Sequence, residues 1–344
     1  MQADVRIVLD EDVRAAFDLS TAFASQVEAF RALAAGEAEL SGKLFLDGDG
    51  SVPTVFAYGA RASLREAACV RVACVGGVTN RRHGLPELDA VIVVTDARTG
   101  LVRALLEGIA FTLIRTAAAA AVAVEHLAAP QARHLALFGS GPQADACAEA
   151  IARVRPLRSI AIWSPTPMRR AAASSRVATV LGNGSGPAVR AARSRTDALR
   201  EADIVVAVTN SRTPVFRGDE VEAGALVVSM GSFRPDRCEV DDRLMDRAAA
   251  VVVDHRPLAL ATAGPVIRWT ARHPHTVPLT IGEVMAGLPV RRSREDIVFF
   301  NSIGLGVQDA AAAARVLTRI EQLDLGTSVG SIRPGSGARP RQDI

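Results

Sequence analysis

The residues Gly139, Ser140 and Gly141 stand between an apolar run and an alanine-rich segment. Residues 135–138 are typical of a buried strand and residues 144–154 of a helix. A strand, a glycine turn and a helix in this order can bind the diphosphate of a dinucleotide: Gly139 permits the tight turn and Gly141, without a Cβ, lets the phosphates approach the backbone. The free N–H groups at the helix start would then bind the anion. Glycine turns also occur without a ligand, but the flanking segments favour nucleotide binding here.

The composition is that of a globular chain with a large core. The chain has 344 residues, of which 49% are hydrophobic, which suits one or two domains. Its formal net charge is only +3 and its basic residues are scattered, which argues against nucleic-acid binding. We find no charged-then-apolar leader and no apolar run of membrane-spanning length. We therefore expect a cytoplasmic protein without a membrane or nucleic-acid partner.

Cysteines and histidines give no sign of a metal site. No cysteine has a second cysteine or a histidine at zinc-ligand spacing. His273 and His275 are close together, but no acid or cysteine accompanies them at ligand spacing, so we expect loop histidines and no bound metal. Buried, reduced thiols are expected at the four cysteines, Cys69, Cys74, Cys147 and Cys238.

The first third of the chain predicts an α+β domain. Residues 10–35 predict one amphipathic helix. The Asp-Gly-Asp-Gly segment at residues 47–50 predicts a hairpin turn, so the neighbouring strands should be antiparallel. Strand patterns occur at residues 43–46, 54–58, 70–75 and 90–95.

From Arg115 onward, strand and helix patterns alternate. Such alternation predicts a parallel sheet with helices on both faces. The segment from Gly326 to the end, rich in Gly, Ser, Pro and Arg, predicts disorder. The expected strands are residues 134–138, 158–163, 203–208, 225–229 and 249–253, and the expected helices are residues 115–125, 142–154, 167–177 and 304–323.

Several short segments together resemble the ornithine cyclodeaminase/mu-crystallin family, in the family's order and over most of the chain. Each segment is weak alone, and their combination is more specific than the glycine loop. The segments are Asn80 with Gly84-Leu85-Pro86, residues 96–100, residues 114–118, the Gly139 loop, residues 202–205, Thr209 with Thr213-Pro214-Val215, Gly231-Ser232 with Glu239-Val240-Asp241, Gly282-Glu283, and Ser302-Ile303-Gly304 with Gln308-Asp309.

The resemblance implies an α/β fold in which a Rossmann-type, doubly wound parallel sheet is inserted in a smaller α+β domain for substrate binding and dimerisation. The Rossmann domain would span residues 117–309. The smaller domain would comprise residues 1–116 and 310–330, and residues 331–344 would be a disordered tail. The resemblance further implies a homodimer and a nicotinamide cofactor, with substrate between the domains.

Arg115 matches the arginine with which the family binds the substrate carboxylate. A guanidinium suits this role because it donates two parallel hydrogen bonds, and we expect Arg115 at the positive start of a helix. The family usually has an arginine at the position of Lys43 and a lysine at that of Arg71, so the two cations are exchanged here. Since a buried lysine can release its proton and an arginine effectively cannot, Lys43 is the better candidate proton donor.

Lys43, Arg71 and Arg115 are therefore the candidate catalytic and substrate-binding residues. The alternatives are that Lys43 is an exposed residue at the start of a hairpin and that Arg115 is a surface arginine paired with an acid.

Phe233 stands where cyclodeaminases of the family carry an aspartate that is implicated in handling the amine. A phenyl ring accepts no proton, and Asp236 is offset by three residues. This segment looks more like the reductase and dehydrogenase branches, so we disfavour ornithine cyclodeamination and take Phe233 as a candidate substrate-binding residue.

The end of the second Rossmann strand bears on the choice of cofactor. An acid there would bind the ribose hydroxyls of NAD. Here residues 159–163 are followed by Ser164 and Thr166, with Arg169 and Arg170 close behind. This favours NADPH, with its extra phosphate on Ser164, Thr166 and Arg169, and leaves NADH possible. Alternatively, the two arginines only solvate a helix.

The motifs and the resemblance give one set of candidate cofactor-binding residues. Asp309 is a weaker candidate near Ser302, because a carboxylate near a helix start is often only a cap. The set comprises Asn80, Thr116, Gly139, Ser140, Gly141, Pro142, Gln143, Ser164, Thr166, Arg169, Thr209, Met230, Gly231 and Ser302.

These observations predict an NAD(P)H-dependent reductase of a C=N bond next to a carboxylate, or in reverse an amino-acid dehydrogenase. Its partner would be a small amino or imino acid. Two alternatives stay open: a deaminating cyclase of the ornithine cyclodeaminase type, and a non-catalytic binder of NADPH or a small ligand, as the crystallin name suggests.

Overall fold

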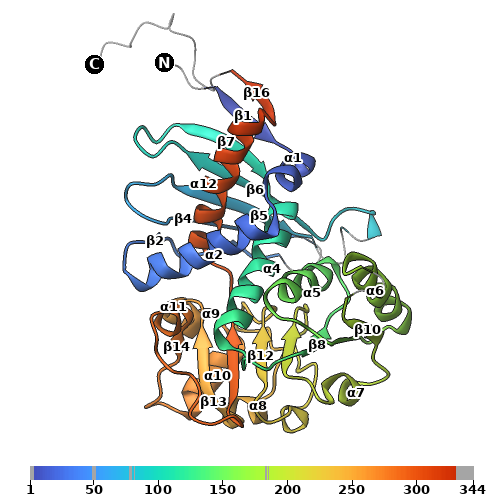
Figure 1. Cartoon of the computed structure of the whole chain (residues 1–344). Helices are drawn as coiled ribbons and strands as arrows, with labels where there is room; N and C mark the ends of the chain where they lie inside the picture. Colours follow the sequence, from blue (N-terminus) through green and yellow to red (C-terminus); the bar gives the residue numbers. More distant parts are fainter. Residues whose placement is uncertain are drawn as a thin grey trace, which may run out of the picture.

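The computed structural model describes residues 4–48, 52–76, 80, 82–182, 184 and 186–330. The predicted tail at residues 331–344 lies outside the described residues. The described chain forms two β-sheets, one above the other in Figure 1, and helix α4 (Gly108–Leu127) runs from one to the other. We call them the mixed sheet and the parallel sheet, after the directions of their strands.

The mixed sheet is built from both ends of the chain. Its strand order is β16-β1-β7-β6-β5-β4-β2, with β3 paired to β4, and its pairs are antiparallel except β1 with β7. The antiparallel pairing of β3 with β4 confirms the expected hairpin. The strands are β1 (Val5–Val8), β2 (Glu39–Leu40), β3 (Leu44–Leu46), β4 (Thr54–Arg61), β5 (Cys69–Val75), β6 (Leu88–Thr95), β7 (Val102–Glu107) and β16 (Thr327–Val329).

Residues 10–35 form two helices, so the prediction of a single helix was wrong. Helix α1 (Asp10–Ala16) ends before Asp18, and α2 (Leu19–Ala34) begins directly after it. The Asp18 carboxylate accepts a hydrogen bond from the Thr21 amide and caps α2. The apolar periodicity of the whole segment concealed this N-cap.

The end of the described chain also differs from the expectation of disorder from Gly326 onward. Strand β16 pairs antiparallel with β1, with Val329 opposite Val5. Backbone hydrogen bonds to the other end of the chain form this strand, and the local composition does not reveal them.

One face of the mixed sheet is covered and the other is open. Helices α2 and α12 (Gly306–Leu323) lie over the covered face (Figure 1). Arg71 points to this side and is buried, whereas its neighbours Val70 and Val72 are 42% and 41% exposed. The open face carries the exposed apolar side chains Leu44, Leu46, Val70, Val72 and Val91.

The parallel sheet has the order β10-β9-β8-β11-β12-β15-β13-β14, and all of its pairs are parallel. This confirms the α/β class with a Rossmann-type sheet, while the exact domain boundaries stay a prediction. The sequence patterns missed β10, β14 and β15. The strands are β8 (His134–Phe138), β9 (Ser159–Trp163), β10 (Ala188–Ala191), β11 (Ile204–Ala207), β12 (Leu226–Ser229), β13 (Ala248–Val253), β14 (Leu279–Thr280) and β15 (Ile297–Asn301).

Helices connect these parallel strands, as crossover connections require. The longer ones at residues 142–154 and 167–177 were predicted, and the short ones were not. They are α5 (Pro142–Val154), α6 (Pro167–Val180), α7 (Arg195–Leu199), α8 (Asp242–Arg247), α9 (Arg256–Thr262), α10 (Gly264–Arg272) and α11 (Ile281–Met285), with a 3₁₀ turn at Gly218–Glu220.

Helix α4 begins seven residues before Arg115, earlier than predicted. The Glu107 carboxylate accepts hydrogen bonds from the Ile109 and Ala110 amides and caps the helix. Among the described residues, α4 is the helix long and apolar enough to cross a membrane, which differs from the expectation that no apolar run has that length. Because 67% of its apolar window is buried inside the fold, α4 is a core helix that packs against both sheets' helices.

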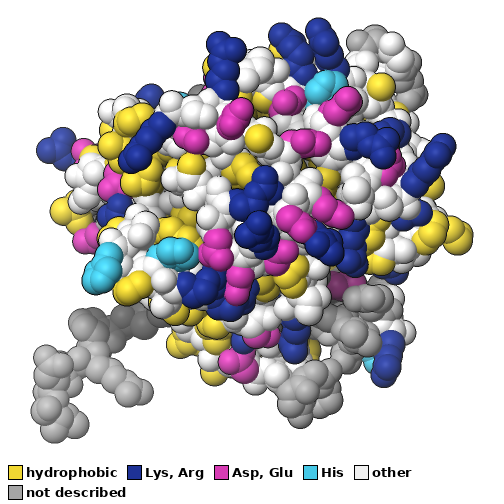
Figure 2. Space-filling view, turned by 90° about the horizontal axis from the view of Figure 1, so that it is seen from below, with side chains coloured by type: hydrophobic (Ala, Val, Ile, Leu, Met, Phe, Trp, Pro, Cys, Tyr) yellow, Lys and Arg dark blue, Asp and Glu magenta, His cyan; other side chains and the backbone are white. Residues whose placement is uncertain are grey.

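The surface mixes charges of both signs. On the face seen from below, Lys and Arg side chains lie among Asp and Glu side chains and form no single basic stripe (Figure 2). This distribution agrees with the near balance of charge in the sequence.

Candidate active site

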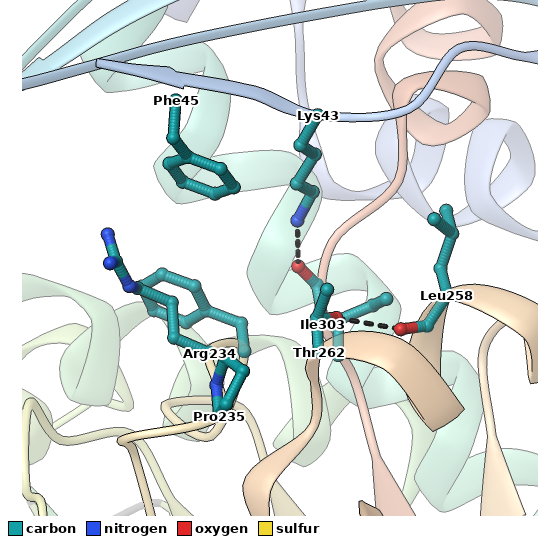
Figure 3. Close-up of a pocket in the computed structure, with 8 residues that line it drawn as sticks. Lys43, Phe45, Arg234, Pro235, Leu258, Thr262 and Ile303 are labelled. Atoms are coloured by element: carbon teal, nitrogen blue, oxygen red, sulfur yellow. Dashed lines mark hydrogen bonds between the residues drawn. The ribbon is translucent and has the colours of Figure 1, made fainter. Parts of the chain in front are cut away.

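A cavity of about 390 Å³ lies where the parallel sheet faces the mixed sheet (Figure 3). Segments that follow β12, β13 and β15 form one side of it, and the start of β3 forms the other. Ligands of open α/β sheets bind at this place, outside the carboxyl ends of the strands. The cavity is lined by Lys43, Phe45, Phe233, Arg234, Pro235, Leu258, Thr262 and Ile303.

Lys43 reaches across the cavity from the mixed sheet. Its Nζ donates a hydrogen bond of 2.9 Å to the Ile303 carbonyl oxygen (Figure 3), and it lies 5.5 Å from the centre of the Tyr58 ring. Burial lowers the pKa of Lys43 to about 8, aided by the positive charge of Arg115 and opposed by the carboxylate of Asp254. Lys43 is therefore half-buried in a charged cluster and is not the exposed hairpin residue of the alternative interpretation.

Asp309 joins the two candidate arginines. The fully buried Asp309 carboxylate accepts hydrogen bonds from Nε and Nη2 of Arg71, at 2.8 and 3.2 Å. Arg115 Nε lies 3.0 Å from Asp309 Oδ1, an ion pair without hydrogen-bond geometry. Burial alone would raise the pKa of Asp309, but both arginines, and a hydrogen bond from Tyr58, hold it below its ordinary value.

Arg71 is bound on all sides by the protein. Its Nη1 donates a 2.6 Å hydrogen bond to the Thr112 hydroxyl, and its other nitrogens bind Asp309. Neither Arg71 nor Arg115 is among the cavity-lining residues, so direct contact of either arginine with substrate stays a prediction.

Arg115 lies in the middle of α4, which corrects the expectation that it stands at a helix start. Its terminal nitrogens donate no hydrogen bond within the described residues. They lie 3.5 Å from the position that a Cβ on Gly304 would occupy, and Gly304 has a φ of +69°. A guanidinium held through Nε, with both terminal nitrogens available, can bind a carboxylate.

Asp254 is a buried residue of the candidate site that the sequence patterns missed. Its Oδ2 accepts hydrogen bonds from the amides of Ile303 and Gly304 and from the Ser302 hydroxyl, at 2.7, 3.1 and 3.2 Å. Burial raises the pKa of Asp254 to about 6, although the amide of Ile303 and the charge of Lys43 oppose the shift. Asp254 thus fixes the turn at residues 302–304, which carries the acceptor for Lys43.

The glycine loop has the expected strand–turn–helix geometry. Gly139 has a φ of +138°, and a Cβ there would lie 2.9 Å from the Val208 carbonyl oxygen. Gly141 caps α5 with Pro142 at the first helical position.

The neighbourhood of this loop fits a dinucleotide. A Cβ on Gly141 would point into space with no atom within 4 Å, so the start of α5 is open to a ligand. The Thr116 hydroxyl is buried without a hydrogen-bond partner in the described chain, which a bound cofactor would supply. Ser140 and Gln143 are tied to the protein: the Ser140 carbonyl oxygen accepts from Arg176, and Gln143 donates to the Leu113 carbonyl oxygen.

Glu239 holds two neighbouring strand ends together. It accepts hydrogen bonds from the Thr209 amide and hydroxyl and from the Gly231 amide and the Ser229 hydroxyl. Burial raises the pKa of Glu239, against these hydrogen bonds. Thr209, Met230 and Gly231 therefore share one edge of the parallel sheet, after β11 and β12. Glu239 was noted only as part of the family resemblance, without a role.

The segment after β9 is arranged differently from expectation. The Ser164 hydroxyl donates to the Thr166 carbonyl oxygen at 3.3 Å, and Arg170, not Arg169, donates to the Ser164 carbonyl oxygen. Arg169 is exposed.

Asn80 forms no hydrogen bond in the described chain to another candidate residue. Its side-chain amide donates to the Pro86 carbonyl oxygen.

The described residues hold no group of three or more His, Cys, Asp or Glu side chains that could bind a metal ion. Within the same residues the four cysteines are free, and three of them are buried.

The fold defines an α/β protein with a Rossmann-like parallel sheet, a strand–glycine turn–helix segment at residues 135–154 and a buried arginine at position 115. Residues 6–323 match the model of the ornithine cyclodeaminase/mu-crystallin family. The chain belongs to this family.

Named relatives include two reductases. The chain is 31% identical over 254 residues to Delta(1)-pyrroline-2-carboxylate reductase of Bacillus cereus strain ZK / E33L, which covers 73% of this chain and 77% of that protein. It is 32% identical over 232 residues to ketimine reductase mu-crystallin of Mus musculus, and the match covers 67% of this chain and 70% of that protein. A solved archaeal alanine dehydrogenase, a dimer with bound NAD, is 26% identical with a TM-score of 0.85, covering 96% of this chain and 99% of that one.

Proposed function

We propose that this protein is an NAD(P)H-dependent reductase of a C=N bond next to a carboxylate, working in reverse as an amino-acid dehydrogenase. The observation that carries the proposal is Arg115, which forms an ion pair with Asp309 and whose terminal nitrogens lie next to Gly304 without a hydrogen bond in the described residues. Relatives named as pyrroline-2-carboxylate and ketimine reductases support the same reaction class.

The residues have separate roles in this reaction. Arg115 binds the substrate carboxylate, and Asp309 together with Arg71 positions it. The bound reduced nicotinamide supplies the hydride for the imine carbon. Lys43 supplies a proton to the nitrogen, since its pKa of about 8 leaves it largely protonated at pH 7 and able to release the proton. If the substrate enters as an iminium, its nitrogen already carries the proton and Lys43 contributes charge alone.

Phe233 lines the cavity, and the family resemblance places an aspartate of cyclodeaminases at this position. Because none of the cavity-lining residues is an acid, the amine of a diamino acid would find no carboxylate there. We therefore favour the reductase over ornithine cyclodeamination.

The cofactor is NADPH in preference to NADH. The turn after β9 holds Ser164 and Thr166 and no acid, and Arg170 contacts it directly. Arg195 lies 4.9 Å over the ring of Trp163, the last residue of β9. An extra phosphate would be attracted to these cations, whereas an acid that would select NAD is missing from this turn.

The protein acts as a homodimer that pairs through the open face of the mixed sheet. Leu44 and Leu46 are 57% and 63% exposed there, beside the valines of β5 and β6. Contiguous apolar surface of this kind marks a protein interface. The archaeal alanine dehydrogenase, a dimer, supports this proposal.

The first experiment follows the oxidation of NADPH and NADH, by loss of absorbance, in the presence of imine acids. The panel holds cyclic five- and six-membered ketimine carboxylates, and 2-oxo acids mixed with ammonia or methylamine. We expect turnover with at least one member and a lower KM for NADPH. Cofactor binding without turnover of any member would replace the proposal with a non-catalytic binder.

A further inference from the structure

The cavity beside Lys43 lies where the side chain of a bound acid would go. Lys43 binds the carbonyl oxygen of Ile303, and the next residue, Gly304, lies against the terminal nitrogens of Arg115. A carboxylate on Arg115 therefore lies next to the turn at residues 302–304, and Ile303 lines the cavity. The lining of the cavity decides which side chain is accepted.

That lining is mainly apolar. Phe45 comes from the mixed sheet (Figure 3). Phe233 comes from the segment after β12. The hydroxyl of Thr262 donates a 2.8 Å hydrogen bond to the Leu258 carbonyl oxygen of its own helix, so its proton is not free for a ligand, although its oxygen can still accept. The remaining apolar lining residues are Pro235, Leu258 and Ile303.

The second cation in the lining is already neutralised. Arg234 forms ion pairs with Asp47 at 3.0 Å and Asp236 at 3.5 Å, and its guanidinium stacks over the Phe45 ring at 5.0 Å. A carboxylate at the far end of a substrate would have to compete with both aspartates. A distant ammonium or guanidinium group would meet Lys43 and Arg234 and no acid of the lining.

The size of the cavity suits a large side chain. Its volume is about 390 Å³, while an apolar cavity of about 150 Å³ is enough to bind benzene. A methyl side chain would leave most of this space unfilled.

On the basis of the proposed function, we infer that the preferred substrates are 2-imino acids with a large apolar side chain, branched or aromatic, and that Phe45, Phe233 and Leu258 determine this preference. Since each methylene in an apolar pocket changes kcat/KM by about 10-fold or more, the preference over a methyl side chain is at least 10-fold.

The test compares imines made from methylamine and four 2-oxo acids: pyruvate, 4-methyl-2-oxopentanoate, phenylpyruvate and oxaloacetate, each with NADPH. A fifth acid, 5-guanidino-2-oxopentanoate, carries a distant cation. We expect kcat/KM at least 10-fold higher for the branched or aromatic member than for pyruvate, oxaloacetate or the guanidino acid. The highest kcat/KM with pyruvate or oxaloacetate would overturn the inference and leave the proposed reductase intact.

Two leucines of α9 give a matched pair of variants. Leu258 lines the cavity, whereas Leu260 is exposed and does not. Leu258→Ala should reduce the preference for the large side chain several-fold, and Leu260→Ala should leave it unchanged. Phe233→Asp should raise kcat/KM for the guanidino acid and lower it for phenylpyruvate. An equal preference for the large side chain in the wild type and in Leu258→Ala would contradict the role of Leu258 in selecting the substrate. If Phe233→Asp does not fold, the comparison of Leu258→Ala with Leu260→Ala still tests the cavity.

Absence of turnover would not leave the inference untested, because binding can be measured separately. With NADPH present, the thermal shift caused by L-leucine or L-phenylalanine should exceed that caused by L-alanine or L-aspartate. A larger shift with alanine or aspartate would reject the apolar cavity, whatever the reaction.

Discussion

At the scale of single residues, the site depends on which donors the protein leaves free. Arg71 and Arg115 share Asp309, yet Arg71 also binds Thr112, and only Arg115 keeps its terminal nitrogens unoccupied within the described residues. The family resemblance assigned the substrate carboxylate to Arg115 and left Arg71 as an additional positive charge. The difference between the two arginines depends on how each contacts the buried carboxylate of Asp309 on α12. No local sequence pattern reveals these contacts.

Arg115→Lys tests the guanidinium separately from the charge. Lysine keeps the positive charge and loses the two parallel donors. We expect kcat/KM for the imine acid to fall about 10- to 100-fold, as for the loss of a hydrogen bond to a charged group, with NADPH affinity unchanged by fluorescence titration. Unchanged kcat/KM would show that the substrate carboxylate binds elsewhere.

Lys43 should determine the alkaline limb of the pH profile. Its pKa of about 8 means that it is protonated below that pH and loses its proton above it, so the rate of imine reduction should fall about 10-fold per pH unit above 8. The charged groups that face Lys43 are Asp254, Arg115, Asp309 and Arg71, beside the Tyr58 ring.

Lys43→Met serves as the comparison. Both proteins are measured with the same cyclic imine acid, so that the effect of substrate ionisation on the rate is the same in both pH profiles. We expect Lys43→Met to reduce the substrate about 100-fold more slowly than the wild type. Its rate should not show the decline above pH 8 that we expect for the wild type. Identical pH profiles of the two proteins would exclude Lys43 as the proton donor.

The roles of two further residues could not be found from the sequence, for a physical reason. Asp254 and Glu239 are fully or almost fully buried carboxylates that accept hydrogen bonds from backbone amides far along the chain. Asp254 is a single acid after an apolar run, and Glu239 is one of several acids in its segment, so neither gives a distinctive spacing signal. The burial and the amide partners that define its role arise only when the strand ends meet.

At the scale of elements, the sequence predicted what depends on local pattern. The glycine turn, α5 and α6 carry their own signals and were found. Strand β10 was missed because its four residues lie in a basic stretch, and β16 because its partner is at the other end of the chain. The separation of α1 from α2 was missed because one apolar face continues across the N-cap.

Two glycines of the turn before α5 should respond differently to alanine. Gly139→Ala places a Cβ at a φ of +138° and 2.9 Å from a carbonyl oxygen, so it should destabilise the fold by about 1–3 kcal/mol. Gly141→Ala meets open space at an ordinary φ of −88°, so it should leave the melting temperature nearly unchanged and weaken NADPH binding. Thermal unfolding measures the stability of each variant, and fluorescence titration measures its NADPH affinity. If Gly141→Ala destabilised the fold and left NADPH binding unchanged, the phosphate-binding role of Gly141 would be contradicted.

At the scale of the whole molecule, the two sheets meet at the site, and neither contains it alone. Lys43 and Arg71 come from the mixed sheet, Ile303 follows the parallel sheet, and Arg115 lies on the helix between them. The sequence predicted this two-lobed architecture through the family resemblance. It could not show which side chains meet, because that depends on the packing of α4 and α12 against both sheets.

The proposed dimer can be tested on the open face. Val72→Lys adds a charge at the centre of that face, and desolvating it at an interface is costly, so size-exclusion chromatography with light scattering should show a monomer. Val180→Lys changes an exposed valine of α6, 53% exposed and away from the open face, and should leave the dimer intact. A Val72→Lys dimer would place the interface elsewhere.

Helix α4 also has a consequence for anyone who redesigns the enzyme by mutagenesis libraries. Its residues 117–121 are five alanines with at most 1% exposure, so a larger side chain there must displace its neighbours, which typically costs about 1–3 kcal/mol. A library that randomises these five positions will therefore contain many destabilised members. The better positions to randomise are Phe45, Phe233 and Leu258, because these residues line the cavity and have room to change. The unchanged helix α4 then keeps Arg115 in place.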